Sequence, residues 1–212
     1  MALNTPLQKT TDPTTNAVSI SPHPYKDEKF LLSRPQTTLT VTSSPHKYKA
    51  TGTIYLTTYR LAFVESGISK GAPPLIHNAT NAEWASVDLP LFGLFGSNFN
   101  QPILGENSLK GKCYVVPENS GFPLTGPNPN PDISWRLTFN SGTCGSFLGA
   151  FFKVMDWVNR RKVEMKSEES NSQNDEDQQN QTKTLLKNIK PSMAKDIKDA
   201  FIDPNDPSAI YL

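Results

Sequence analysis

Five basic residues are spaced so that their side chains could hold a phosphate or another anion. Lys47, Lys49 and Arg60 flank a segment whose pattern indicates a β-hairpin. Lys110 and Lys112 alternate within a second strand-like run and therefore point to one face of it. Ammonium and guanidinium groups form charge-assisted hydrogen bonds to phosphate. The alternative interpretation is that all five are ordinary solvated cations, and that Arg60 pairs with a local carboxylate or carbonyl.

No other set of residues has the spacing of a catalytic or metal centre. His23, His46 and His77 lie in or near predicted loops, with no Cys, Asp or Glu at metal-ligand spacing. Cys113 and Cys144 could be redox sensors, but reduced, buried thiols are the more common case. The glycine-rich segments lack the pattern of a Walker or Rossmann loop. We therefore expect a protein that is not an enzyme, with no catalytic residues, no cofactor and no metal ion.

The net charge of +1 conceals an uneven distribution along the chain. Residues 28–162 contain 13 basic and 8 acidic residues, whereas the flanking segments contain 8 and 12. A basic central part permits an anionic partner without requiring one. The N-terminus has no signal-peptide pattern, and the most apolar run, 147–158, is too short to span a bilayer. We expect a soluble protein of the nucleus and cytoplasm, with at most peripheral contact with membranes.

Strand-like patterns dominate the central part, and a single helix follows them. The clearest alternation of apolar and polar residues runs over 133–139 and begins with Ile133 and Trp135 on one face. Further strands are predicted over residues 38–42, 52–57, 60–64, 83–89 and 109–116. Apolar residues at helical spacing predict an amphipathic helix over 147–162, with an Arg-Arg-Lys cluster in its last turn. No pattern predicts sequence-specific DNA reading.

The composition divides the chain into four parts. Residues 1–27 are rich in Thr, Ser and Pro, which predicts a disordered tail, and residues 28–162 form the folded domain. An acidic linker is predicted over 163–183, because it has almost no apolar residues. In the last part, 184–212, a short amphipathic helix and an extended end are predicted to dock on a partner or on the protein's own domain. The residues expected at that contact are Met193, Ile197, Phe201 and Tyr211.

One run of the first hairpin resembles a known family. Residues 52–63 read Gly-Thr-Ile-Tyr-Leu-Thr-Thr-Tyr-Arg-Leu-Ala-Phe. This is similar to the opening hairpin of GRAM domains, where a Gly-x-x-Tyr-Leu-Thr-x-x-Arg run is typical. The resemblance implies a mainly β, pleckstrin-homology-like (PH-like) barrel or sandwich of about seven strands, capped by one C-terminal helix. In such a fold, cations near the open end of the hairpins could grip a phosphoinositide headgroup.

A narrower resemblance covers roughly residues 28–160. The runs 101–111 (Gln-Pro-Ile-Leu-Gly-Glu-Asn-Ser-Leu-Lys-Gly) and 135–139 (Trp-Arg-Leu-Thr-Phe) look like the GRAM domain of the WW domain-binding protein 2 and postacrosomal sheath family. That family carries Pro-Pro-x-Tyr motifs, which bind WW domains as extended segments. Here the Pro-Pro pair, 73–74, is followed by Leu75 and Ile76, so the tyrosine is missing.

Two functional hypotheses follow. The resemblance implies an adaptor that acts as a nuclear transcription coactivator and associates with chromatin, with transcription factors or WW-domain proteins as partners. The cations around the hairpin favour a different class, a peripheral membrane module that recognises phosphoinositides. A test of binding to liposomes distinguishes the two hypotheses.

Overall fold

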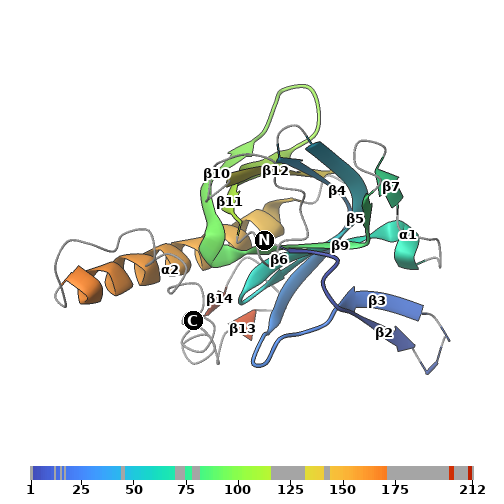
Figure 1. The fold of residues 1–212 in the computed structure, drawn as a ribbon, viewed down its shortest axis with the longest axis horizontal. Coiled ribbons are helices and arrows are strands. Elements are labelled where there is room, and N and C mark those ends of the chain that lie inside the picture. The colour runs from blue at the N-terminus through green and yellow to red at the C-terminus, as the bar shows by residue number, and fades with distance from the viewer. Residues whose placement is uncertain are drawn as a thin grey trace.

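The structure, a computed structural model, describes most of the central part of the chain and short pieces of both ends. The described residues are 2–11, 13–14, 16, 18–43, 46–69, 75–77, 82–115, 132–140, 144–170, 201–202 and 210–211. Most of them form one strongly curled antiparallel sheet and one long helix, α2 (Gly145–Ser170), which begins behind the sheet and runs out to the left in Figure 1. The predicted mainly β class is confirmed.

The sheet has eight strands in the order β1-β9-β6-β5-β4-β12-β11-β10, and all neighbouring strands are antiparallel. The strands β4, β5, β6 and β9 pair in chain order, and so do β10, β11 and β12, whereas β9 and β10 do not pair with each other. The last of these strands, β12, pairs with the first, β4. Their bounds are β4 (Phe30–Ser43), β5 (His46–Thr57), β6 (Arg60–Glu65), β9 (Ser86–Pro90), β10 (Leu94–Asn100), β11 (Ser108–Tyr114) and β12 (Asp132–Phe139). The prediction of about seven strands and one helix is therefore confirmed.

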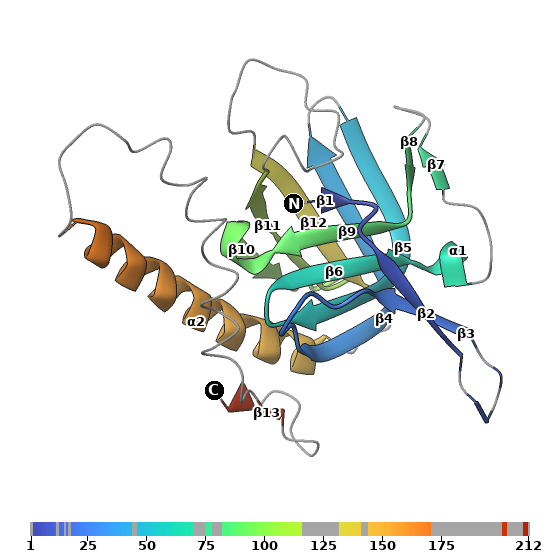
Figure 2. The same cartoon turned by 60° about the horizontal axis from the view of Figure 1, so that its bottom comes forward.

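Smaller elements surround the sheet. A 3-10 helix, η1 (Leu91–Gly93), carries the chain from β9 to β10, and β1 (Ala2–Leu3) adds to the edge at β9. Figure 2 shows the pair β2 and β3 projecting away from the curled sheet. The remaining elements are β2 (Leu7–Thr11), β3 (Val18–Pro22), α1 (Ser66–Ser69), β7 (Leu75–His77), β8 (Ala82–Trp84), β13 (Phe201–Ile202) and β14 (Ile210–Tyr211).

The core forms where β12 faces α2. The apolar residues of β12 are buried and its polar residues point outward, as a period of two requires. The Trp135 ring meets Phe151 edge-on at 6.4 Å between centroids, and Phe139 lies 5.5 Å from Phe147. Such aromatic pairs stabilise a core beyond their buried area. The helix therefore closes the open end of the curled sheet, as its apolar stripe predicted.

The helix is longer than the sequence pattern suggested. The acidic linker was predicted to begin at 163, but α2 continues to Ser170. Arg161 donates to Glu164 at 2.9 Å where this extension begins, and such pairs support an exposed helical turn. Met165, within the extension, is partly buried against the core. The first part of the linker prediction is therefore wrong, and its remainder, from 171, lies outside the described residues.

The N-terminal residues are more ordered than predicted. Residues 7–11 pair with 18–22 as a hairpin, and 2–3 pair with β9. The Ala85 N–H donates to the Asn4 side chain at 2.7 Å, and Thr5 and Ser86 are joined by hydrogen bonds between buried groups. Backbone pairing and these polar contacts hold the segment despite its few apolar residues. The prediction of a disordered tail over 1–27 is therefore wrong for these strands.

The C-terminal prediction divides into two parts. Phe201 lies in β13 and pairs with Tyr211 of β14, so the predicted helix does not include Phe201, whereas the extended state of Tyr211 is confirmed. Prolines at 204 and 207 disfavour a helix that continues through this region. Met193 and Ile197 lie outside the described residues.

Candidate functional site

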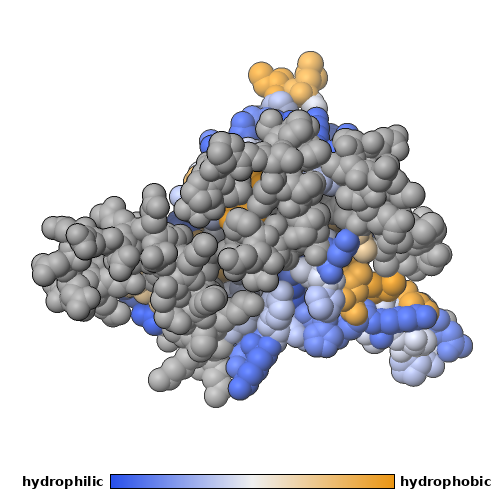
Figure 3. All heavy atoms as spheres, viewed as in Figure 1, coloured by the Kyte–Doolittle hydropathy of each residue, from blue (hydrophilic) through white to orange (hydrophobic). Residues whose placement is uncertain are grey.

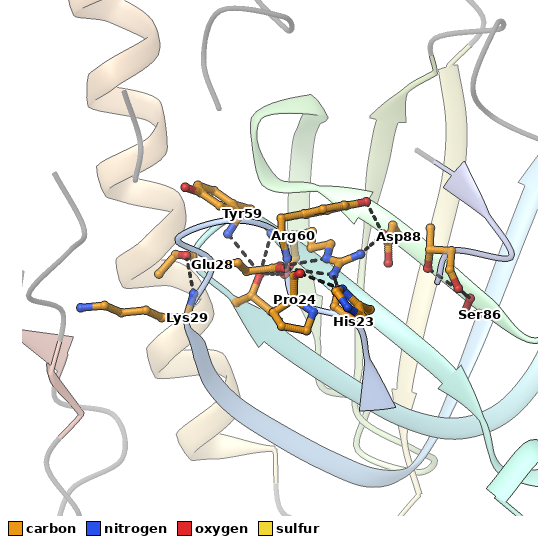
Figure 4. A network of polar contacts seen from close by, with 12 residues as sticks. His23, Pro24, Glu28, Lys29, Tyr59, Arg60, Ser86 and Asp88 are labelled. Carbon is orange, nitrogen blue, oxygen red and sulfur yellow. Dashed lines mark hydrogen bonds and ion pairs between the residues drawn. The ribbon is translucent and has the colours of Figure 1, made fainter. Parts of the chain in front are cut away.

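Arg60 lies at the centre of a buried network of charges. Its Nε donates to Glu28 Oε1 at 2.8 Å and its Nη2 donates to Glu28 Oε2 at 2.9 Å, so the two side chains meet as a fork. The same guanidinium also donates to Asp88 and, at 2.7 Å, to the His23 carbonyl. Figure 4 shows these groups converging from the N-terminal segment, β6 and β9. The Arg60 side chain is only 2% exposed.

The hairpin turn positions Arg60 through Thr57. The Thr57 hydroxyl accepts hydrogen bonds from the backbone N–H groups of Tyr59 and Arg60 at 3.1 and 2.9 Å, and donates to Glu28 Oε1 at 2.7 Å. A side chain at Gly52 would place its Cβ 2.0 Å from the Val64 carbonyl oxygen, so only glycine fits the close approach of β5 and β6. The Gly-x-x-Tyr-Leu-Thr-x-x-Arg run therefore contains residues that stabilise the hairpin itself.

Tyr25 covers the network on its outer side. Its ring lies 4.0 Å from the Arg60 guanidinium, and its hydroxyl donates to Asp88 Oδ2 at 3.2 Å. Burial, and then the negative charge of Asp88, raise the pKa of Tyr25 to about 12. Two carboxylates, a carbonyl and an aromatic face therefore already surround Arg60. The prediction that Arg60 contacts an external anion is wrong, and the alternative, pairing with nearby carboxylates, is what the structure shows.

The four predicted lysines lie together on a different surface, the outer face of the sheet. All four are exposed, and they line one groove of about 890 Å³ with a cation that the sequence analysis did not select, Arg136 of β12. Cross-strand pairing aligns the groove residues in two rows: Lys49, Thr40, Arg136 and Lys110 in one, and Lys47, Thr42, Ser134 and Lys112 in the other. We call this surface, Lys47, Lys49, Lys110, Lys112 and Arg136, the cationic face.

Two residues of like charge stand opposite each other within the cationic face. Arg136 stands directly opposite Lys110, where Cβ atoms of neighbouring strands are about 5 Å apart and like charges destabilise the sheet. Within the part of the chain that the structure describes, Lys47, Lys49, Lys110 and Arg136 form no ion pair. Glu106 is the one carboxylate among the described residues that line the groove. The arrangement costs stability and favours an anion from outside.

The groove also offers hydroxyl groups. Thr40, Thr42 and Ser134 stand between the lysines of β5 and the cations of β11 and β12. A hydroxyl can donate one hydrogen bond to a phosphate oxygen and accept another. Alternating cationic and hydroxyl side chains on a shallow, open surface suit a ligand with several phosphate groups better than a small ion, which needs an enclosing pocket.

The other sequence candidates have structural explanations. Lys162 donates to the Leu94 carbonyl at 3.0 Å and lies over the Phe92 ring, so it joins α2 to the sheet. Arg160 pairs with Asp156 within the helix. These basic residues of α2 therefore have structural roles. Cys113 is fully buried, and burial raises the pKa of its thiol to about 11, which opposes reactivity. Cys144 is buried as well.

Metal and membrane-spanning elements are absent from the described residues. No group of three or more His, Cys, Asp or Glu side chains gathers there as a metal ion would require. The described helices also include none whose length and apolar character would allow it to cross a bilayer.

Comparison with known proteins gives structural similarities only. No protein-family model and no curated protein matches the chain. Among solved structures, the Vps36 N-terminal PH domain is similar, with 15% identity and a TM-score of 0.45 over 76% of this chain and 95% of that one. A chain of the 8S snRNP assembly intermediate is similar at 9% identity and a TM-score of 0.37, over 61% of this chain and 80% of the other.

Proposed function

We propose that this chain is a non-catalytic, PH-like binding module whose cationic face holds phosphorylated lipid headgroups at an anionic membrane surface. The observation that carries the proposal is the direct opposition of Arg136 and Lys110. Two like charges in register lower the stability of the sheet, and a bound phosphate between them would reverse that effect.

The amount of charge on the face suits a membrane ligand. Each Lys or Arg near an anionic leaflet contributes roughly 1 kcal/mol to binding. Lys47, Lys49, Lys110 and Arg136 are all exposed on one face of the four successive strands β5, β4, β12 and β11, so one headgroup and its neighbours can meet several of them together. The groove is open rather than enclosed by walls, which suits a headgroup that remains attached to a bilayer.

Sedimentation with vesicles tests this function. Phosphatidylcholine vesicles with and without a phosphatidylinositol phosphate are compared for the wild type and for the double variant Lys49→Glu/Lys110→Glu. We expect the wild type to bind only the anionic vesicles, and the variant to bind at least about tenfold more weakly, since each charge contributes roughly 1 kcal/mol. Binding should also weaken as salt rises.

Lys153→Glu provides the matched control, because Lys153 is an exposed lysine of α2 outside the groove. It is a single Lys→Glu reversal at another place, so it carries half the change of charge of the double variant. A wild type that ignores anionic vesicles at low salt would contradict the proposal. An equal loss in Lys153→Glu would show that total charge matters and the cationic face does not.

The hairpin favours a second candidate function. Gly52, Thr57 and Arg60 each have a defined structural role at the positions that the GRAM resemblance matches. By that resemblance, the chain would be an adaptor of the WW domain-binding protein 2 type, acting in the nucleus as a transcription coactivator on chromatin. Transcription factors would be its partners, and WW-domain proteins too if a segment other than Pro-Pro-x-Tyr bound them.

Cell fractionation with affinity purification tests the second candidate. Nuclear enrichment and co-purification with transcription factors, unchanged in Lys49→Glu/Lys110→Glu, would favour the adaptor. Loss of membrane association in that variant, without nuclear enrichment of the wild type, would favour the membrane module.

A further inference from the structure

The loop between β10 and β11 exposes two large aliphatic side chains at its tip. Ile103 is 102% exposed and Leu104 90% exposed, more than any other large apolar residue among those described. The loop rises above the sheet at the top of Figure 1, and Figure 3 shows hydrophobic atoms protruding there with hydrophilic atoms beneath them. Exposed apolar groups that adjoin one another in this way usually mark a contact surface.

The base of this loop is fixed to the rest of the domain. The last paired residues of the hairpin are Asn100 and Ser108, and Ser108 is buried. The Phe139 N–H donates to the Asn107 carbonyl at 3.0 Å, and the Asn107 side chain donates to Cys144 Sγ at 3.3 Å. These contacts anchor the base of the loop to β12 and to the residue that precedes α2, and the tip projects beyond this base.

Gly105 shapes the tip. Its φ of +119° lies in a region that other residues rarely adopt, and it directly follows the aliphatic pair. The chain can therefore reverse immediately after Leu104, which leaves both aliphatic side chains at the outermost part of the loop.

The tip and part of the cationic face belong to the same hairpin. Lys110 is two residues beyond Ser108, so it lies about 7 Å along β11 from the base of the loop, at about 3.3 Å per residue. Arg136 and Lys49 continue the row across the sheet. The apolar tip of the loop therefore lies near one end of the row formed by Lys110, Arg136 and Lys49. Glu106, on the loop between them, is the local opposing charge.

We propose that Ile103 and Leu104 insert into the apolar boundary of an anionic bilayer while the cationic face contacts the phosphates above it. This inference rests on the proposed function. A bilayer accepts a protruding tip of any shape, whereas a protein partner must supply a matching pocket. The depth of 5–10 Å typical of interfacial insertion is within reach of a tip two residues long. The row of cations behind the tip matches the charge of an anionic leaflet.

A fluorescent probe on the tip tests insertion directly. Both native cysteines are buried, so Ile103→Cys can be labelled selectively with an environment-sensitive dye. On addition of vesicles of phosphatidylcholine with a phosphatidylinositol phosphate, we expect a blue shift in emission and quenching by nitroxide groups on the lipid chains. Val163→Cys, labelled on an exposed aliphatic position of α2 that is 67% exposed, should show neither.

A second variant separates insertion from recognition of phosphate. Ile103→Ser/Leu104→Ser should weaken vesicle binding by at least about a hundredfold, since it removes two aliphatic side chains that would leave water. Its affinity for soluble inositol hexakisphosphate should equal that of the wild type, because the cationic face is intact. The substitutions are at fully exposed positions, so the unfolding temperature should be unchanged.

The outcomes are distinguishable. If the wild type binds vesicles but the probe at residue 103 stays in water, insertion is wrong and the proposed function stands. If the wild type binds neither vesicles nor inositol hexakisphosphate, both proposals fail. If the double serine variant binds vesicles like the wild type and instead loses a co-purifying protein, the tip belongs to a protein interface and insertion is overturned.

Discussion

The hairpin of β5 and β6 contains members of two groups of charges that have opposite environments. Arg60, in β6, is buried and bonded to two carboxylates. Lys49, in the neighbouring strand β5, is exposed on the cationic face, where the nearest cross-strand row contains Arg136 and Lys110. Sequence patterns treat Arg60, Lys49 and Lys110 alike, as cations of a β-rich domain. The structure makes one a part of the fold and leaves the others available to a ligand.

The difference shows how burial determines the role of a charge. A buried guanidinium must be fully paired, because leaving it without partners costs several kcal/mol. An exposed lysine has no such requirement, so its position is free to serve binding. Like charges that stand opposite each other on the surface lower the stability of the sheet. Because they do not stabilise the fold, we interpret them as part of a ligand site.

Removing the buried charge should have the largest effect. Arg60→Met leaves Glu28 and Asp88 buried without their partner, so we expect the free energy of unfolding to fall by roughly 3–5 kcal/mol. Urea denaturation followed by tryptophan fluorescence measures this. Arg60→Lys keeps the charge but loses the fork to Glu28, and it should lie between Arg60→Met and the wild type.

Lys49→Met is the matched control for the exposed group. We expect a change within about 0.5 kcal/mol, as for most surface substitutions. If Lys49→Met destabilised the protein as much as Arg60→Met does, the distinction between the two groups of charges would be wrong.

Alkaline titration should report on the integrity of the Arg60 network. The pKa of Tyr25 is raised from 10.0 to about 12, so between these values the unfolded chain loses the proton and the folded chain keeps it. The stability that Tyr25 contributes is therefore fully present below pH 10 and decreases as pH rises toward 12. The difference in phenolate absorbance between the wild type and Tyr25→Phe should titrate near pH 12. A difference that titrates near pH 10 would contradict the packing of Tyr25 on the network.

Local patterns were sufficient to predict most of the fold. The alternation in β12 and the helical spacing from Phe147 reflect which side of each element is buried, which is a property of neighbouring residues. The strand β10 was not predicted, since Gly96 has a φ of +60° and the register shifts between Phe95 and Asn98, which interrupts the alternation. The N-terminal strands were missed because backbone pairing, rather than apolar burial, holds them.

The candidate site depended on pairing between distant segments. Four of its five cations were selected as a possible anion site, but Arg136 was not, because its position beside Lys110 follows from the register of β11 with β12. Likewise, Glu28 and Asp88 lie far from Arg60 in the sequence, so only the register and the N-terminal segment show that Arg60 is already paired. Type and spacing indicate which residues can bind an anion, and tertiary contacts determine which ones are free to do so.

The smallest predicted effect is the most specific to the cationic face. Lys110→Glu places a carboxylate opposite Arg136 and turns a repulsive cross-strand pair into an attractive one. We expect the free energy of unfolding to rise by roughly 0.2–1 kcal/mol, while affinity for anionic vesicles falls. A substitution that stabilises the fold and weakens binding is the mark of a surface kept for its ligand rather than for stability. Thermal unfolding and vesicle sedimentation on one protein preparation measure both effects. A loss of stability in Lys110→Glu would mean that Lys110 supports the sheet as Arg60 does, and the contrast between the two groups of charges would not hold.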